Sequence, residues 1–496
     1  MAYENSQAFL HEGKILTGVE QFENTCRIDV QSDKPIRKII SIKALPKITA
    51  SEKVSDEVEV SGRTNYQIVF ESDDNVITSS SSYVEWQHKI ASEYEVNFLV
   101  PSIISNEIIS FSTNEIAILT TININKYSIV SEKLSTVENL PEHYVVKQNT
   151  YDCQRIINSV SQSFNEVLEQ ENTSRISEIL NYSAVVNVKS VSALIDAIAV
   201  EGEVLVDVVA KEGDDVVSIN KVVDFKQELS MLSVVPNNIV DADVYLSDLK
   251  VTISAGDSEE KTNIIYSPEL TVNAVAYSKE QVSVVEDAFS LKKQTLMTRE
   301  CVNALSYENS ITIKETISGA IDIQTDVDSV CFVLDSKIKE VAFEQKEDSL
   351  NINGVVNLDV LTALDSGERT KIEGGFQFSI NVPEVKESSS ITVSSRVESC
   401  KLRGGKIEVV CEILGKATNQ TGEYISFVSS IEELEDKELD NSAIVVRVVK
   451  EGETIFDVAK ELSVSPEELV NQNPTLEDGI EEGMRLVVYS PLVLDF

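Results

Sequence analysis

Alternating apolar and polar residues run along most of the chain, and three segments share one pattern centred on a glycine. The segments are VEVSGRTNYQIVF around Gly62, IAVEGEVLVDVVA around Gly202 and LNINGVVNLDVLT around Gly354. Apolar residues fall at even offsets from each glycine, and a period of two over a dozen positions predicts a strand with one buried face. A glycine on the inward phase predicts a bend or a close approach of another backbone.

The similarity continues beyond these strands. A turn rich in Asp, Asn and Gly follows each one, at 73–75, 213–215 and 365–367, and such turns favour hairpins. The next expected strand then carries an aromatic residue in each case. These aromatic residues are Trp86, Phe225 and Phe378. Because the glycines lie 140 and 152 residues apart, the pattern predicts three tandem copies of one domain.

Each copy is rich in Val, Ile, Thr and Ser in short alternating runs. We therefore predict a mainly β protein with three tandem antiparallel repeats, each a β-sandwich or a partly closed barrel, at 1–147, 148–302 and 303–430. Within 155–171, helical spacing competes with strand spacing. Residues 431–443 are predicted to form an acidic linker.

The pattern changes at residues 444–490, where a short apolar strand, two short helices and a closing strand are predicted. Thr454 is expected to cap the first helix. Ser465 begins the second, followed by Pro466 and by Glu468 at the position of a capping box. The pair at 473–474, Asn-Pro, ends it. The prediction for this segment is a small βααβ domain.

This segment resembles a LysM domain. The landmarks are GETI at 452–455, DVAKELSVSPEEL at 457–469, Asn-Pro at 473–474 and the spacing of Ile480, Gly483 and Leu486. The resemblance implies a shallow groove that binds N-acetylglucosamine polymers, between the loop after the first strand and the loop after the second helix. Carried over to this sequence, the partner- or glycan-binding groove consists of Gly452, Glu453, Thr454, Ile455, Phe456, Asn473, Pro474 and Ile480.

Phe456 is expected to be the main contact residue of that groove. It lies one position away from the apolar face that the first helix turns to the core, and an exposed aromatic ring offers a large rigid contact surface. The alternative is that its ring packs against the preceding β domain or the linker. One departure from the family is Glu453, which stands where Asp is usual.

Charge and motifs narrow the range of functions. The 42 Lys and Arg against 83 Asp and Glu give a net charge of −41, which disfavours nucleic acid and anionic membranes as partners. No secretory signal and no apolar run long enough to span a bilayer is expected. The six cysteines are scattered and are expected to be reduced.

Catalysis has little support in the sequence. The three histidines are isolated from one another, and HExxH, GxSxG and P-loop motifs are absent from the sequence. We therefore expect no catalytic residues, no metal site and no cofactor. The locally basic stretch 34–47 is either a solvated strand or a docking site for an acidic neighbour.

Tandem β repeats with one terminal LysM resemble the SipL-type (SpoIVA-interacting protein L) clostridial spore-coat morphogenesis proteins. That resemblance implies the mother-cell cytoplasm at the forespore surface, with a SpoIVA-like coat morphogenetic ATPase, and other coat proteins, as partners. The expected function is a non-enzymatic adaptor that helps coat assemble around the forespore. The alternative is a LysM protein of the spore envelope that binds peptidoglycan, and a hydrolase within a β repeat is a third option.

Overall fold

The computed structural model describes residues 2–4, 7–30, 32, 34–172, 175–213, 215–256, 261–323, 327–346, 349–386, 389–437 and 444–489. As predicted, the protein is mainly β, and its sheets are antiparallel and open. A helix of the length and apolar character needed to cross a membrane does not occur among these residues.

Three successive sets of six strands form the body, and we call them units 1, 2 and 3. Unit 1 comprises β2 (Gln7–Asp29), β3 (Ile36–Val54), β4 (Glu57–Ser72), β5 (Ile77–Ala91), β6 (Phe98–Phe111) and β7 (Glu115–Thr136). Unit 2 comprises β8 (Tyr144–Asn165), β10 (Ile176–Ala193), β11 (Ala197–Glu212), β12 (Asp215–Ser230), β13 (Ile239–Ala255) and β14 (Thr262–Ser290). Unit 3 comprises β15 (Lys293–Asp322), β16 (Val327–Lys346), β17 (Ser349–Leu364), β18 (Arg369–Pro383), β19 (Ser390–Arg403) and β20 (Lys406–Asp436).

The strand order is the same in all three units. The second, third and fourth strands of each unit form one sheet, and the first, sixth and fifth form the other. In unit 2 a single apolar cluster joins the inner faces of the two sheets, with Val204 and Phe225 from one sheet and Leu270 and Val272 from the other. Two short strands lie outside this scheme, with β1 (Ala2–Glu4) paired to β20 and β9 (Leu168–Glu171) paired to β14.

The three glycines of the sequence pattern lie at equivalent places, on the third strand of each unit. Each is paired with the aromatic residue of the following strand, as Gly62 with Trp86, Gly202 with Phe225 and Gly354 with Phe378. None of the three has a positive φ. Instead, a Cβ at each position would collide with the aromatic ring. The glycine therefore provides space for the ring, and the bend appears as a register shift in the neighbouring second strand, between Ile48 and Ala50 in unit 1, for example.

Several expected boundaries fall within long strands. Boundaries at 147, 302 and 430 fall inside β8, β15 and β20, which run on without a break. Residues 431–436 of the expected linker extend β20, because they pair with β15; 437 follows the strand, and 438–443 lie outside the described residues. The ambiguous segment 155–171 is extended and paired with β14.

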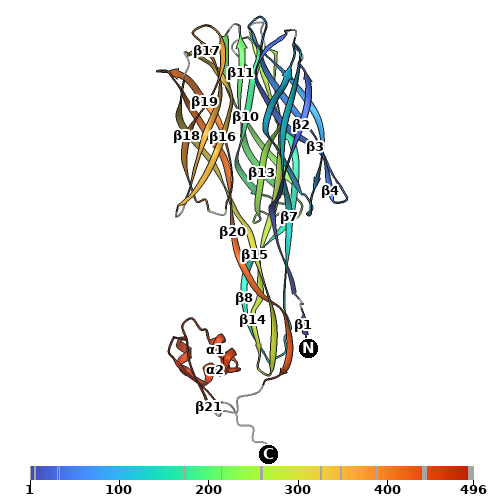
Figure 1. Ribbon diagram of the computed structural model, residues 1–496. Coiled ribbons are helices and arrows are strands. Elements are labelled where there is room, and N and C mark those ends of the chain that lie inside the picture. The colour runs from blue at the N-terminus through green and yellow to red at the C-terminus, as the bar shows by residue number, and fades with distance from the viewer. Residues whose placement is uncertain are drawn as a thin grey trace, which may run out of the picture.

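The molecule is elongated, with a wide head and a narrow stalk (Figure 1). The stalk consists of the extensions of the first and last strands of the units, among them β8, β14, β15 and β20. Its interior is apolar and is shared by the units: Leu134 of β7, Val284 of β14 and Phe427 of β20 belong to one buried cluster.

The head contains a second apolar cluster to which every unit contributes. Val69, Val209 and Leu361 come from the third strands, and Ile40, Leu180 and Phe332 come from the second strands. Both trios have the same 140- and 152-residue spacing as the three glycines. The units therefore meet through corresponding residues on the faces opposite to their inner cores.

Buried ion pairs also join the three units. Lys14 of unit 1 and Lys416 of unit 3 both contact Asp241 and Asp243 of unit 2. The Asp241 side chain is only 3% exposed. Burial alone would lower the pKa of Lys14 and raise that of Asp243, but the opposite charges raise the first and lower the second.

The basic stretch 34–47 is used inside the molecule. Lys47 forms an ion pair with Glu269 of unit 2. Lys43 donates to the carbonyl of Tyr182 in unit 2, at 3.2 Å, and Lys38 to that of Arg369 in unit 3, also at 3.2 Å. These lysines therefore hold neighbouring units together.

We predict that Gly202→Ala lowers the free energy of unfolding by about 1–3 kcal/mol. The new Cβ would lie 2.5 Å from the carbonyl oxygen of Asn187 and 2.5 Å from the Phe225 ring. The matched control is Gly13→Ala, whose nearest neighbour would be an ordinary 3.5 Å away. Urea unfolding measures both, and equal stabilities of the two variants would contradict the packing argument.

A second prediction concerns the buried ion pairs. Asp241→Asn removes a charge that neutralises two lysines, so it should lower the free energy of unfolding by about 3–5 kcal/mol. Asp224→Asn is the control, because Asp224 forms an exposed pair with Lys189 and should cost less than about 1 kcal/mol. If both variants unfold at the same urea concentration, the ion pairs do not stabilise the contact among the three units.

Candidate functional site

The C-terminal residues 444–489 form a small separate module with the element order βααβ. It consists of β21 (Ile444–Val448), α1 (Ile455–Leu462), α2 (Pro466–Gln472), the 3₁₀ turn η1 (Pro474–Asp478) and β22 (Arg485–Tyr489). The two strands pair antiparallel, from Ile444 opposite Tyr489 to Val448 opposite Arg485. Val458, Leu469, Leu476 and Leu486 fill the space between the helices and this sheet.

Helix α1 begins where the sequence predicts. The hydroxyl of Thr454 accepts from the backbone N–H of Asp457, and the Asp457 carboxylate accepts from the Thr454 backbone N–H at 2.9 Å. This reciprocal pair is a complete capping box. The donors of Thr454 hold the pKa of Asp457 below its ordinary value. Thr454 itself remains exposed.

Helix α2 has only half of the capping box expected for it. The Ser465 hydroxyl accepts from the Glu468 backbone N–H at 3.1 Å, with Pro466 in the first turn. The Glu468 carboxylate accepts instead from the side chain of Gln472 at 3.2 Å. The helix therefore begins at the predicted residue, with a single side-chain cap.

Glu453 is occupied within the module. Its carboxylate accepts from the Lys450 backbone N–H at 2.7 Å and from the Arg447 guanidinium at 2.8 Å. The same guanidinium contacts Glu461 on α1 at 2.6 Å. These bonds fix the loop that enters α1, in which exposed Gly452 has a φ of +77°.

Asn473 is buried, and every polar atom of its side chain has an internal partner. Its amide N–H groups donate to the carbonyls of Leu469 at 2.9 Å and Val487 at 2.8 Å, and its amide oxygen accepts from the Val487 N–H at 2.7 Å. Asn473 therefore joins the end of α2 to the outer edge of β22. Its amide is not presented to a ligand in this structure.

Phe456 contacts the body of the protein. Its ring lies edge-on to that of Phe289 near the end of β14, with ring centroids 5.3 Å apart. One turn later, Lys460 forms an ion pair with Asp287 of β14 at 2.6 Å. Burial would raise the pKa of Asp287, but Lys460 and Arg299 together lower it. The module thus rests on the stalk through one face of α1, beside the lower end of β14 (Figure 1).

The predicted groove residues consequently fall into three groups. Glu453 and Asn473 bond to other residues of the module. Ile455, Phe456 and Ile480 are half-buried in the same apolar cluster. Gly452, Thr454 and Pro474 are exposed, on the two loops that the sequence assigned to the groove. The structure has Phe456 packed against the body, which is the alternative stated for this residue. What sequence analysis missed is the ion pair of Lys460 with Asp287.

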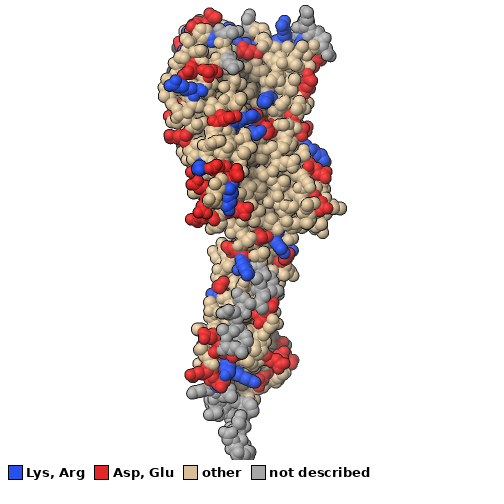
Figure 2. Space-filling view, turned by 90° about the vertical axis from the view of Figure 1, so that its right-hand side faces the viewer, with Lys and Arg blue, Asp and Glu red and all other residues tan. Residues whose placement is uncertain are grey.

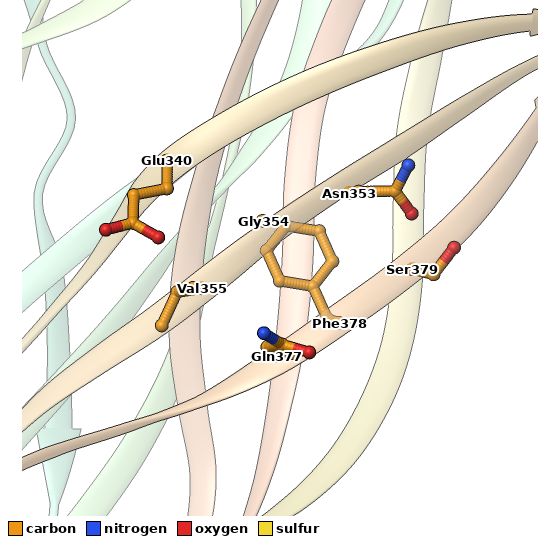
Figure 3. A pocket seen from close by; sticks show the side chains of 7 residues that line it. All are labelled: Glu340, Asn353, Gly354, Val355, Gln377, Phe378 and Ser379. Carbon is orange, nitrogen blue, oxygen red and sulfur yellow. The ribbon is translucent and has the colours of Figure 1, made fainter.

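A separate open hollow, of about 480 Å³, lies on unit 3 over the glycine of β17. Figure 3 shows the Phe378 ring beside Gly354, with Glu340, Asn353 and Gln377 around it. Glu340 has a positive φ of 54° and lies at the register shift of β16. The hollow follows from the glycine–aromatic pair and the bulge.

Comparisons with known proteins identify no relative: no family model, no curated protein and no solved structure matches this chain.

We predict that Asn473→Ala destabilises the module by about 1–3 kcal/mol, because it leaves the N–H and the C=O of Val487 without the partner that Asn473 provides. Hydrogen exchange at the β22 amides measures the effect, with exposed Thr475→Ala as the control. If Asn473→Ala leaves exchange unchanged but weakens the binding of a partner, Asn473 is a contact residue, as the LysM resemblance implies.

Proposed function

We propose that this chain is a non-enzymatic adaptor of the spore coat, with three copies of one β-sandwich domain and a C-terminal LysM domain. Three copies are supported by the identical strand order of units 1 to 3 and by the glycine–aromatic pair in each. The LysM assignment is supported by the βααβ order and the capped helix at GETI.

In this proposal the LysM domain binds a SpoIVA-like coat morphogenetic ATPase at the forespore surface, in the mother-cell cytoplasm. The observation that carries the proposal is the position of the module at the base of the stalk (Figure 1). It rests on the body through Phe456 and Lys460, while Gly452, Thr454 and Pro474 stay exposed. The body would then serve as a rigid spacer and a platform for other coat proteins.

The charge of the chain supports a protein partner. Figure 2 shows Asp and Glu side chains along both the head and the stalk of one face, in a chain of net charge −41. A field of this sign repels nucleic acid and anionic polymers, and it favours association with neutral or basic protein surfaces.

The alternative function is binding of peptidoglycan or another N-acetylglucosamine polymer of the spore envelope. It is favoured by the exposure of Gly452, Thr454 and Pro474 on the two loops between which the family's groove lies. Exposed loop backbone and a hydroxyl are groups that can bond to a sugar.

We predict that the full chain retains the purified ATPase in a pull-down and that a chain ending at Lys437 does not. The parallel arm is sedimentation with purified peptidoglycan, in which the full chain should stay in the supernatant. Circular dichroism of the shortened chain checks that the β body remains folded. Sedimentation with peptidoglycan together with no retention of the ATPase would replace the adaptor by the glycan-binding function.

A further inference from the structure

The sheet of the C-terminal module has one apolar face that the described part of the chain leaves uncovered. Ile444, Val446 and Val448 of β21 are 55%, 59% and 48% exposed, and Tyr489 of β22 is 56% exposed. The residues between them face the core, since Val445 is paired with buried Val488.

The two outer edges of this sheet differ. The edge of β22 is closed by side chains, because Asn473 bonds to both the N–H and the C=O of Val487 and Gln472 accepts from the Tyr489 N–H at 2.7 Å. The main-chain groups of Val487 and Tyr489 therefore point away from β21.

The pairing register shows which main-chain groups lie on the outer edge of β21. Val446 is paired with Val487, and Ile444 with Tyr489. In an antiparallel ladder, opposite residues either exchange both bonds or exchange none, so the N–H and C=O groups of Ile444 and Val446 also point outward. Within the described residues these groups have no hydrogen-bond partner.

Edge strands are commonly protected by charges, prolines or covering elements. Strand β21, of sequence IVVRV, has no proline. Its one charged residue, Arg447, is held by Glu453 and Glu461 and also donates to the Val448 carbonyl, so the open part of the edge is at Ile444 and Val446. The open edge and the apolar face belong to the same residues, which is the arrangement that strand addition requires.

We propose that β21 receives an extended segment of the adaptor's protein partner, which adds to the sheet as a third strand. This inference rests on the proposed function and names the surface of the module that would carry it. The incoming segment has aliphatic side chains at alternate positions, over Ile444, Val446 and Val448, and a carboxylate near Arg485. Arg485 is exposed opposite Val448 and has no ion-pair partner among the described residues.

A second copy of this chain fits less well. Pairing of β21 with its own copy would supply no carboxylate for Arg485, because IVVRV contains none. It would also bring together two chains that each carry a net charge of −41.

The test uses Val446→Pro in the full chain. Proline removes only an N–H that points outward, so an edge position tolerates it, while an incoming strand loses that bond. Val446→Lys is the second variant, which places a charge on the apolar face. Thr475→Lys, exposed on η1 of the same module, is the matched control. The probe is the purified ATPase of the proposed function, and binding is followed by interferometry.

We expect both Val446 variants to raise Kd at least tenfold with the module still folded, and Thr475→Lys to leave it unchanged. Amide hydrogen exchange should show protection of Ile444 and Val446 only when the ATPase is bound. Unchanged binding by folded Val446 variants, or protection at 452–454 and 475 instead, would overturn strand addition and leave the adaptor function standing. Absence of binding by the unmodified chain would overturn both.

Two further outcomes would assign the edge to another occupant and overturn the proposal. Protection of Val446 in the free chain that disappears on removing 490–496 would make this segment the occupant. A dimer of the unmodified chain in sedimentation, abolished by Val446→Lys, would make it a second copy.

Discussion

The contact among the three units depends on the burial of their central strands on both faces. In β4, β11 and β17 one face fills the core of the unit, and the opposite face contributes Val69, Val209 and Leu361 to a shared cluster. A shift of such a strand by one residue would exchange its two faces. The residues of the inner core and those of the shared cluster would then both lose their apolar partners. The shared cluster therefore fixes the strands within each unit and the units relative to one another, and the Lys14–Asp241–Lys416 contact joins the same three units at a second place.

The stalk is a consequence of this arrangement. Because the first and last strands of each unit are brought side by side, they continue beyond the head and enclose a narrow apolar core that includes Leu134, Val284 and Phe427. β14, β15 and β20 reach 29, 30 and 31 residues, well above the usual strand length. Asp287 and Phe289, which the module contacts, lie near the end of β14. Their position relative to the head therefore depends on the packing of β14 along the stalk.

The sequence predicted the parts of the fold that depend on local periodicity. The apolar residues at even offsets from Gly62, Gly202 and Gly354 predicted the inner face of each unit. The turns rich in Asp, Asn and Gly predicted the hairpins. Both signals are local, because each lies within one or two neighbouring strands. The odd-offset residues Val69, Val209 and Leu361 recur seven positions after each glycine. Their repetition could have indicated a second buried face on each strand. That the three units pack against one another through this face is visible only in the folded structure.

The ends of the long strands and the residues that the module contacts on the stalk could not be predicted, because both depend on neighbours that are distant in the sequence. Residues 431–436 have the composition of a solvated linker, yet pairing with β15 holds them in a strand; backbone pairing depends on the neighbour rather than on the side chains. Likewise the place of Phe456 off the apolar face of α1 left packing against the β body as one alternative, but its partner Phe289 lies 167 positions away, and no local pattern identifies that partner.

Two residues of the LysM resemblance use their polar groups for the folding of the module. Asn473 is a landmark of the LysM resemblance, and Glu453 stands where that family usually has Asp. Both bond within the module, Asn473 to Val487 and Glu453 to Lys450 and Arg447. A residue that completes a loop or closes a strand edge can recur in a family without touching its ligand. By closing the β22 edge, Asn473 also makes β21 the edge that remains open. A landmark residue can thus direct where a partner binds through the backbone it satisfies, rather than through a contact of its own.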